Sequence, residues 1–180
     1  AGQSTDADRK VLLYNLAAEK FNSQKALYNL AALYIAKNEP ANAERTLARL
    51  EDKNSAEVQN LLGVAAMLRS DYEAASKLLA KAGNAAAAQN LAAIDIYNGD
   101  YAAAASKLKN TTGTNAALAN ILNGDLKAAS AALTGDDALT NYLKAIVAAR
   151  KGDVSAAKAA LKLATDKCPK LAERAAKDIE

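Results

Sequence analysis

The 180-residue sequence contains no histidine and a single cysteine, Cys168. Histidine is the commonest general base and the commonest metal ligand of proteins, so the usual acid–base and metal chemistry is missing. One cysteine can form neither an intrachain disulfide nor the paired thiolates of a structural zinc site. No glycine-rich phosphate loop of the GxGxxG or GxxxxGK[ST] type occurs. These absences predict that the protein is not an enzyme and uses no metal and no cofactor.

Large apolar residues are also scarce. There is no Trp, one Phe and one Met, and Ala supplies much of the 51% hydrophobic fraction. Ala favours helices that pack closely, whereas sheets need the β-branched and aromatic residues that are few here. No run of about 18 apolar residues exists, which predicts no membrane insertion by this segment. The composition therefore predicts an all-α protein.

The charged residues are not distributed as nucleic-acid binding would require. The chain has 23 basic and 20 acidic residues, for a net charge of +3, and the two signs are interspersed. A nucleic-acid-binding protein usually gathers its basic residues in a patch or a stripe. The expected partner is therefore a protein or a peptide, and no nucleic acid.

Paired carboxylates can act as acid and base without histidine, and two places carry candidate acids. Asp136 and Asp137 follow Gly135 in a turn, where capping of the next helix explains them. Asp95 interrupts the apolar run LAAIDIY. It lies either on an exposed helix surface or in a groove beside a Lys or Arg. Neither place predicts catalysis.

A short corner followed by an Ala-rich run recurs along the chain. The corners are Asn38-Glu39-Pro40, Ser70-Asp71-Tyr72, Gly99-Asp100-Tyr101, Gly124-Asp125-Leu126 and Gly152-Asp153-Val154. A helical pattern stands on each side of every corner, which predicts repeats at about 25–51, 56–82, 86–109, 115–133 and 138–165. Residues 5–20 and 169–179 are predicted to form capping helices at the two ends.

The corner residues suit a turn between two helices. A glycine such as Gly99 can take the left-handed conformation that closes the first helix. The acid after it can accept hydrogen bonds from the free N–H groups of the second helix. In the second helices, an Ala falls four residues after the acid and a Leu four residues later, on one helix face. These pairs are Ala43 and Leu47, Ala75 and Leu79, Ala104 and Leu108, Ala129 and Leu133, and Ala157 and Leu161.

The second repeat, AEVQNLLGVAAMLRSDYEAASKLLAKA at 56–82, resembles the tetratricopeptide repeat. The matching residues are Leu62, Gly63, Asp71, Tyr72, Ala75, Leu79 and Ala82. The resemblance extends over about residues 25–169, although the repeats are shorter than in that family and lack its Trp. It implies a right-handed α-α superhelix of about five helix-turn-helix repeats plus N-terminal and C-terminal capping helices, in a single domain of residues 1–180.

The family binds extended peptides on the concave face of its first helices, often through Asn side chains. The candidate binding residues here are Asn29, Asn60, Asn90, Asn115, Tyr28, Tyr97 and Tyr142, with Asn141 as a weaker candidate. The amides are expected either to grip a ligand backbone or to pair with one another between helices.

Two functions therefore remain open. The first is a protein- or peptide-binding scaffold. The second is a structural spacer or self-association module of a larger protein, with a possible homo-oligomer. The repeat style is similar to repeat regions of bacterial cell-envelope proteins, which predicts a periplasmic or envelope-associated location.

Overall fold

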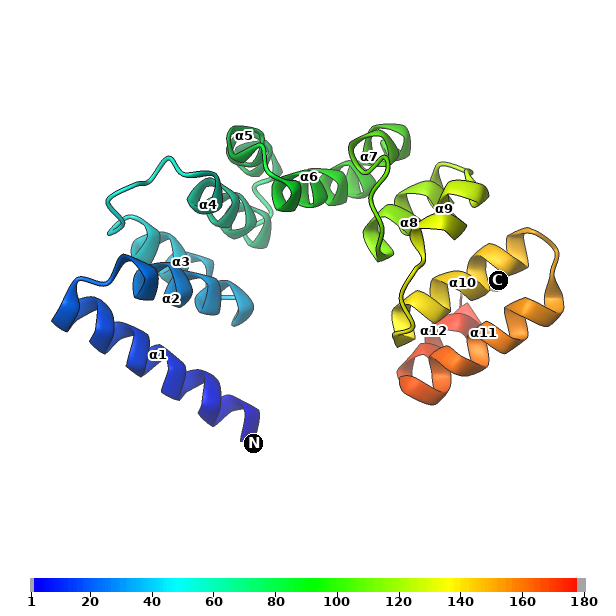
Figure 1. Cartoon of the computed structure of the whole chain (residues 1–180), viewed down its shortest axis with the longest axis horizontal. Coiled ribbons are helices and arrows are strands. Elements are labelled where there is room, and N and C mark those ends of the chain that lie inside the picture. Colours follow the sequence, from blue (N-terminus) through cyan, green and yellow to red (C-terminus); the bar gives the residue numbers. More distant parts are fainter. Residues whose placement is uncertain (1, 178–180) are drawn as a thin grey trace. The chain divides into compact units, whose positions relative to one another are not determined.

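Residues 2–177, which the computed structural model describes, form twelve helices and no strand (Figure 1). The prediction of an all-α protein is confirmed. The helices are α1 (Gly2–Phe21), α2 (Gln24–Ala36), α3 (Pro40–Leu47), α4 (Ala56–Leu68), α5 (Tyr72–Ala82), α6 (Ala85–Asn98), α7 (Tyr101–Lys107), α8 (Thr114–Leu122), α9 (Leu126–Ala132), α10 (Ala138–Arg150), α11 (Val154–Lys167) and α12 (Lys170–Lys177).

The helices after α1 follow one another as pairs joined by the predicted corners. Within the pairs, α2 packs against α3, α4 against α5, α8 against α9, and α10 against α11. The terminal helices flank the pairs: α1 packs on α2, and α12 on α11. The predicted C-terminal cap extended to residue 179, and residues 178 and 179 lie outside the described residues.

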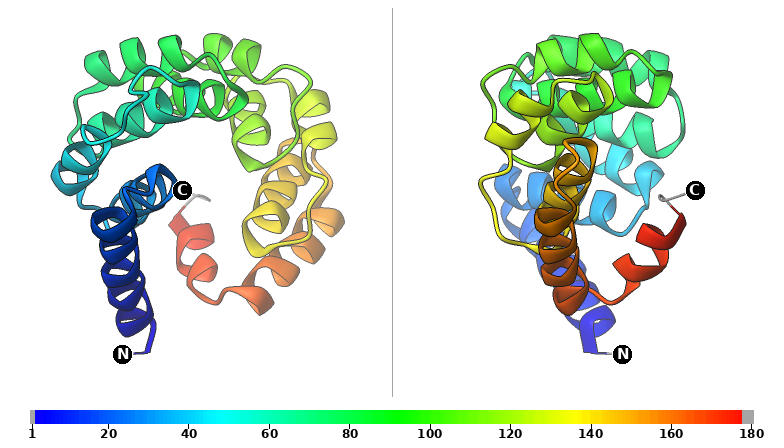
Figure 2. Two further views of the ribbon diagram at one scale, coloured as in Figure 1. Left: turned by 60° about the vertical axis from the view of Figure 1, so that its left-hand side comes forward. Right: turned by 90° about the vertical axis from the view of Figure 1, so that its right-hand side faces the viewer.

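The chain divides into two compact units, Ala1–Ile94 and Asp95–Glu180. The single repeat domain over residues 1–180 stays a prediction. Figure 2 shows the helix pairs succeeding one another along the chain within each unit. The border falls inside α6. In a helical array each pair contacts only its neighbours, so no shared core ties distant pairs together. A chain built this way can divide wherever its contacts are fewest.

Each corner places one residue in the left-handed region. The five φ values are 58° at Asn38, 62° at Ser70, 82° at Gly99, 84° at Gly124 and 79° at Gly152. The next residue donates its backbone N–H to the carbonyl five residues earlier, as Asp71 does to Ala66 at 2.9 Å. This bond closes the first helix in a Schellman-type turn.

The same acidic residue begins the second helix. The Asp71 carboxylate accepts a hydrogen bond from the N–H of Ala74 at 3.1 Å, and Asp100, Asp125 and Asp153 cap their helices in the same way. At the first corner Glu39 makes no side-chain cap, and Pro40 occupies the first turn, where an N–H is not needed. One Asp thus joins two helices through both its backbone and its side chain.

The predicted Ala and Leu pairs form the contact surface of the second helices. Ala43, Ala75, Ala104 and Ala129 are completely buried, and the Leu residues that follow them are buried too. Ala157 and Leu161 of α11 are only half-buried. The difference arises because α11 is the last second helix, with only α12 packed beyond it.

The first helices carry a matching small residue, eight positions before each corner acid. These residues are Ala31, Gly63, Ala92, Ala117 and Ala145, and all are buried. The closest approach is at Gly63, where a Cβ atom would lie 2.6 Å from Cγ and 2.7 Å from Cδ2 of Leu79. Small side chains on both helices of a pair therefore let the backbones come close enough for a single Leu to fill the space between them.

We expect Gly63→Ala to destabilise the protein. A glycine in a helix normally gains about 1 kcal/mol of stability on replacement by Ala. Here the added methyl group would overlap Leu79, and overpacking of this kind costs about 1–3 kcal/mol. Urea unfolding followed by circular dichroism measures the net effect. In a Leu79→Ala background the same change should stabilise, and a gain in the wild-type background would contradict the packing described.

Candidate functional site

In the unit of residues 1–94, the candidate binding face is formed by the first helices of the pairs. N-caps set where these helices begin: Ser23 accepts a hydrogen bond from Ala26 N–H, and Ser55 from Val58 N–H. Asn84 accepts one from Ala87 N–H at 2.8 Å before α6. The caps place three predicted amides on successive first helices, Asn29 on α2, Asn60 on α4 and Asn90 on α6, and all three are half-buried.

Two of these amides hydrogen-bond to each other. Asn90 Nδ2 donates to Asn60 Oδ1 at 3.0 Å, and we call the two residues the amide pair. The bond joins neighbouring first helices, so the pairing alternative of the sequence analysis holds for these two residues. An amide offers two N–H donors and an oxygen with two lone pairs. The bond does not use the NH₂ group of Asn60 or the oxygen of Asn90. Within residues 2–177, neither of these two groups has another hydrogen-bond partner.

The tyrosine candidates differ in exposure. Tyr28 of α2 is half-buried and packs against the core cluster that contains Leu27 and Leu47. Tyr97 of α6, in the unit of residues 95–180, is 69% exposed. Asn115 is exposed at the start of α8. Tyr28 belongs to the unit of residues 1–94, and Tyr97 and Asn115 belong to the unit of residues 95–180.

Tyr142 is a core residue, and its prediction as a groove residue is wrong. Its exposure is only 3%, and it packs in a cluster with Ala164 of α11 and Ala175 of α12. The terminal helix α12 contributes to this burial, which the pattern within α10 does not reveal. Asn141, the weaker amide candidate, is 2% exposed and donates to the Asp136 carboxylate at 2.9 Å.

Gln59 belongs to the same region and was not predicted. It is buried beside Asn60, and its Nε2 donates to the Lys53 carbonyl at 2.7 Å. Its Oε1 is the one buried side-chain polar atom in residues 2–177 without a hydrogen-bond partner. An unsatisfied buried acceptor costs about 1–3 kcal/mol. The signal was the repeated tripeptide Gln-Asn-Leu, at 59–61 and 89–91, of which only the Asn was singled out.

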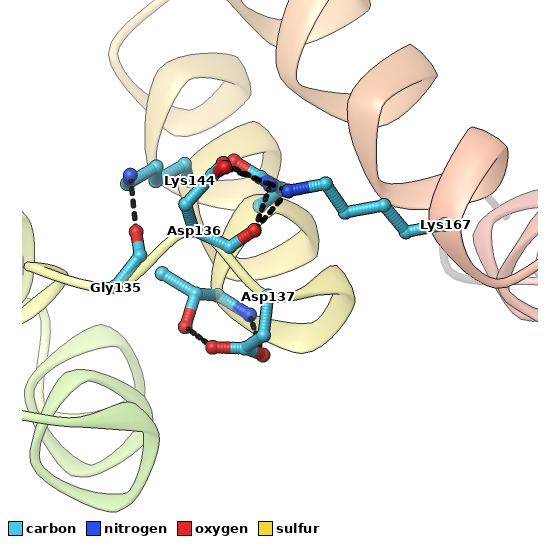
Figure 3. Close-up of polar contacts among 7 residues, drawn as sticks. Gly135, Asp136, Asp137, Lys144 and Lys167 are labelled. Atoms are coloured by element: carbon cyan, nitrogen blue, oxygen red, sulfur yellow. Dashed lines mark hydrogen bonds and ion pairs between the residues drawn. The ribbon is translucent and has the colours of Figure 1, made fainter.

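Asp136 and Asp137 lie in a cluster of hydrogen bonds at the start of α10 (Figure 3). The Asp136 carboxylate accepts hydrogen bonds from Lys167 of α11 at 2.7 Å and from Asn141. Lys144 donates to the Gly135 carbonyl at 2.8 Å. Asp137 caps α10 by accepting from Thr140 N–H at 3.0 Å, as predicted. The carboxylates are committed to helix-capping and loop-anchoring bonds, which accounts for both acids without catalysis.

These bonds also lower the pKa values of the two carboxyl groups. The hydrogen bond from Lys167, followed by that from Asn141, holds the pKa of Asp136 below its ordinary value. The hydroxyl and backbone N–H of Thr140 lower the pKa of Asp137. Bonds that favour the charged form lower a carboxyl pKa in this way.

Asp95 forms an ion pair with Lys107 of α7 at 2.6 Å, and 19% of its side chain is exposed. Asp95 is therefore largely covered and has a basic neighbour, so the expectation of a fully exposed surface position is wrong. Within residues 2–177, no three or more His, Cys, Asp or Glu side chains gather as metal ligands would.

Two surface hollows occur in the unit of residues 95–180. The larger, about 630 Å³, lies between α7 and α9 and includes Asn110, Thr112 and Asn120. The smaller, about 220 Å³, includes Lys144, Lys151 and Asp153. Neither hollow is lined by Asp95, by Asp136 or by any predicted binding residue.

Comparisons with known proteins add little to this geometry. No protein-family model and no curated protein matches the sequence. A solved structure titled "Crystal structure of MamA" is similar at 20% sequence identity and a TM-score of 0.40, over 95% of this chain and 94% of that chain. A likeness of this strength supports no inference about function. Among the helices of residues 2–177, none has the length and apolar composition that a membrane crossing requires.

The amide pair should contribute to stability through its mutual bond. Asn60→Ala leaves a half-buried donor of Asn90 without its partner, and a typical net hydrogen bond is worth about 0.5–1.5 kcal/mol. We expect the two single Ala variants and the double variant to show a coupling of about 1 kcal/mol in urea unfolding. Strictly additive losses would contradict the bond.

Low pH should weaken the hydrogen bonds that Asp136 and Asp137 accept at the start of α10. A carboxyl whose pKa is lowered in the folded state stabilises the protein above its unfolded pKa, near 3.8, and this contribution is lost as the pH falls toward the folded value. We therefore expect the urea concentration at the unfolding midpoint to decrease when the pH is lowered below about 4. The decrease should be smaller in Asp136→Asn. Lys167→Met, which removes the largest cause of the lowered pKa, should flatten the profile similarly. Parallel profiles for all three proteins would contradict this role.

Proposed function

We propose that the protein is a non-catalytic scaffold of the tetratricopeptide-repeat type that binds an extended peptide segment of a partner protein. The observation that carries the proposal is the amide pair, which stands across two neighbouring first helices and keeps a donor group and an acceptor group unused. An extended peptide presents the complementary groups, one C=O and one N–H at each residue. Such a pair can bond to a backbone without reading its side chains.

The internal bond supports binding as well as stability. Asn loses side-chain freedom when it is held, and an amide fixed before the ligand arrives does not lose that freedom again on binding. The Asn90–Asn60 bond orients both side chains in this way. Tyr28 and Asn29 lie on α2, which packs against α4, so they are positioned to extend the contact along the same unit.

A structural spacer is the second candidate function. Its support is that the same amides bond to each other and that Tyr142 is buried, so part of the predicted face has no exposed side chain to offer. In this proposal the Asn residues hold neighbouring helices in register, and no ligand is needed. A place in the cell envelope, predicted from the style of the repeats, is part of both proposals.

Peptide selection distinguishes the two functions. The full chain is immobilised, and peptides of about 12 random residues are selected by phage display, since an extended segment of this length spans several helices. We expect selected peptides to lose about tenfold in affinity with Asn60→Ala or Asn90→Ala, the equivalent of one hydrogen bond to the ligand. Asn42→Ala, which removes an amide from the second helix α3, is the matched control and should not change the affinity.

Two outcomes would contradict the scaffold function. One is a failure to select any peptide that binds reproducibly. The other is peptides whose affinity is unchanged in the Asn60, Asn90, Asn29 and Asn115 variants. The unfolding measurements on the same variants show whether the Asn residues act only in stability.

A further inference from the structure

Two of the five corners are preceded by an asparagine. Asn98 stands directly before Gly99, and Asn123 stands directly before Gly124. Both asparagines are exposed, and within residues 2–177 neither side chain has a hydrogen-bond partner. Nothing in the described part of the chain therefore holds either amide away from the backbone of the glycine that follows it.

An Asn-Gly sequence permits a reaction within the chain. The backbone nitrogen of the glycine attacks the side-chain carbon Cγ, and the bond between Cγ and the amide nitrogen breaks. The proton of the glycine N–H leaves with the NH₂ group as ammonia, and a cyclic imide remains. Water then opens the imide at either carbonyl, which gives aspartate or isoaspartate without any oxidation or reduction. Glycine favours the attack because it has no Cβ atom to obstruct the approach of its nitrogen.

We propose that Asn98 and Asn123 are sites of spontaneous deamidation, and that isoaspartate formed at either position opens the corner that follows it. Neither asparagine belongs to the amide pair. The proposal is therefore independent of the proposed function.

The folded corner slows the attack but does not prevent it. The Gly99 N–H donates to the Ile96 carbonyl at 3.1 Å, and each nitrogen must leave such a bond before it can reach Cγ. The Gly124 N–H makes the corresponding bond to Ile121 at 3.2 Å. Both bonds lie at the C-terminal ends of helices, α6 and α8, and helix ends fray at little cost in free energy. The reaction therefore proceeds from a locally opened corner, without global unfolding.

Isoaspartate is incompatible with the bond that closes the corner. The Asp100 N–H donates to the Asp95 carbonyl at 2.8 Å across the first of these corners. The Asp125 N–H makes the same bond to Asn120 at 2.9 Å across the second. The backbone between donor and acceptor passes through the asparagine, and isoaspartate adds a methylene group to this path. The new carboxylate also lies at the C-terminal end of a helix, where the helix dipole disfavours negative charge.

The chain contains its own comparison sites. At the fifth corner, Lys151 precedes Gly152, and the same closing bond joins Asp153 N–H to the carbonyl five residues earlier. Asn38 and Asn110 are exposed like the two candidate sites, but glutamate and threonine follow them. The Cβ atoms of those residues hinder the attacking nitrogen. Exposure of an asparagine alone is therefore not sufficient for the reaction.

Ageing of the full chain tests the two sites. The folded protein is incubated in mildly alkaline buffer, digested at acidic pH and mapped by mass spectrometry, and an isoaspartate-specific methyltransferase labels the product. We expect isoaspartate to accumulate at positions 98 and 123 severalfold faster than at Asn38 or Asn110. A rate at either position that is no greater than the rate at Asn110 would overturn the assignment of that position.

Matched variants test the effect on the corner. The double variant Asn98→Lys, Asn123→Lys copies the sequence around Lys151 and should keep its urea midpoint throughout the incubation, whereas the midpoint of the wild type should decrease. The double variant Asn98→Asp, Asn123→Asp supplies the charge without the longer backbone. Its midpoint should therefore lie above that of the aged wild type. An aged wild type with an unchanged midpoint, or with the midpoint of the Asp variant, would refute the opening of the corner.

Discussion

The acidic residue at each corner is the residue on which the architecture depends, and at four of the five corners it is an aspartate whose side chain also caps the second helix. Its backbone N–H closes one helix and its carboxylate begins the next, so a single residue determines both where a pair turns and where its second helix starts. The left-handed residue before it makes the reversal possible, and a residue other than glycine occupies that position at Asn38 and Ser70. The five corners share a left-handed residue and the backbone bond that closes the first helix, and in the pair of α4 and α5 the helices approach closely at Gly63 and Leu79.

That close approach limits the chemistry the protein can offer. Helices that pack through Ala and Gly leave little volume between them, and the candidate acids Asp95 and Asp136 are held in local bonds. Asp95 is paired with Lys107, and Asp136 with Lys167. The amides of Asn60 and Asn90 also bond to each other, and the proposed function depends on the donor and acceptor groups that this bond leaves over.

Local chemistry was predictable from the sequence, and contacts between distant residues were not. The corners and the caps, such as Asp71 and Asp137, involve residues within five positions of one another, so their roles can be inferred from spacing alone. The bond between Asn60 and Asn90 joins residues thirty positions apart, and its existence depends on how two pairs stack. The burial of Tyr142 depends on α12, and nothing within α10 indicates it. Gly63 was recognised by its resemblance to a repeat motif, whereas its tight contact with Leu79 required the structure.

The pentapeptide YNLAA shows why burial cannot be inferred from a local pattern. In α2 it lies between a helix before it and a helix after it, and Leu30 is buried. In α1 the same five residues have α2 on one side only, and Leu16 is half exposed. Burial in a repeat array depends on whether a helix has a packed neighbour on each side, and the pattern within that helix does not specify this. At the C-terminal end, the polar helix α12 covers α11, whereas α1 keeps its leucines at the surface.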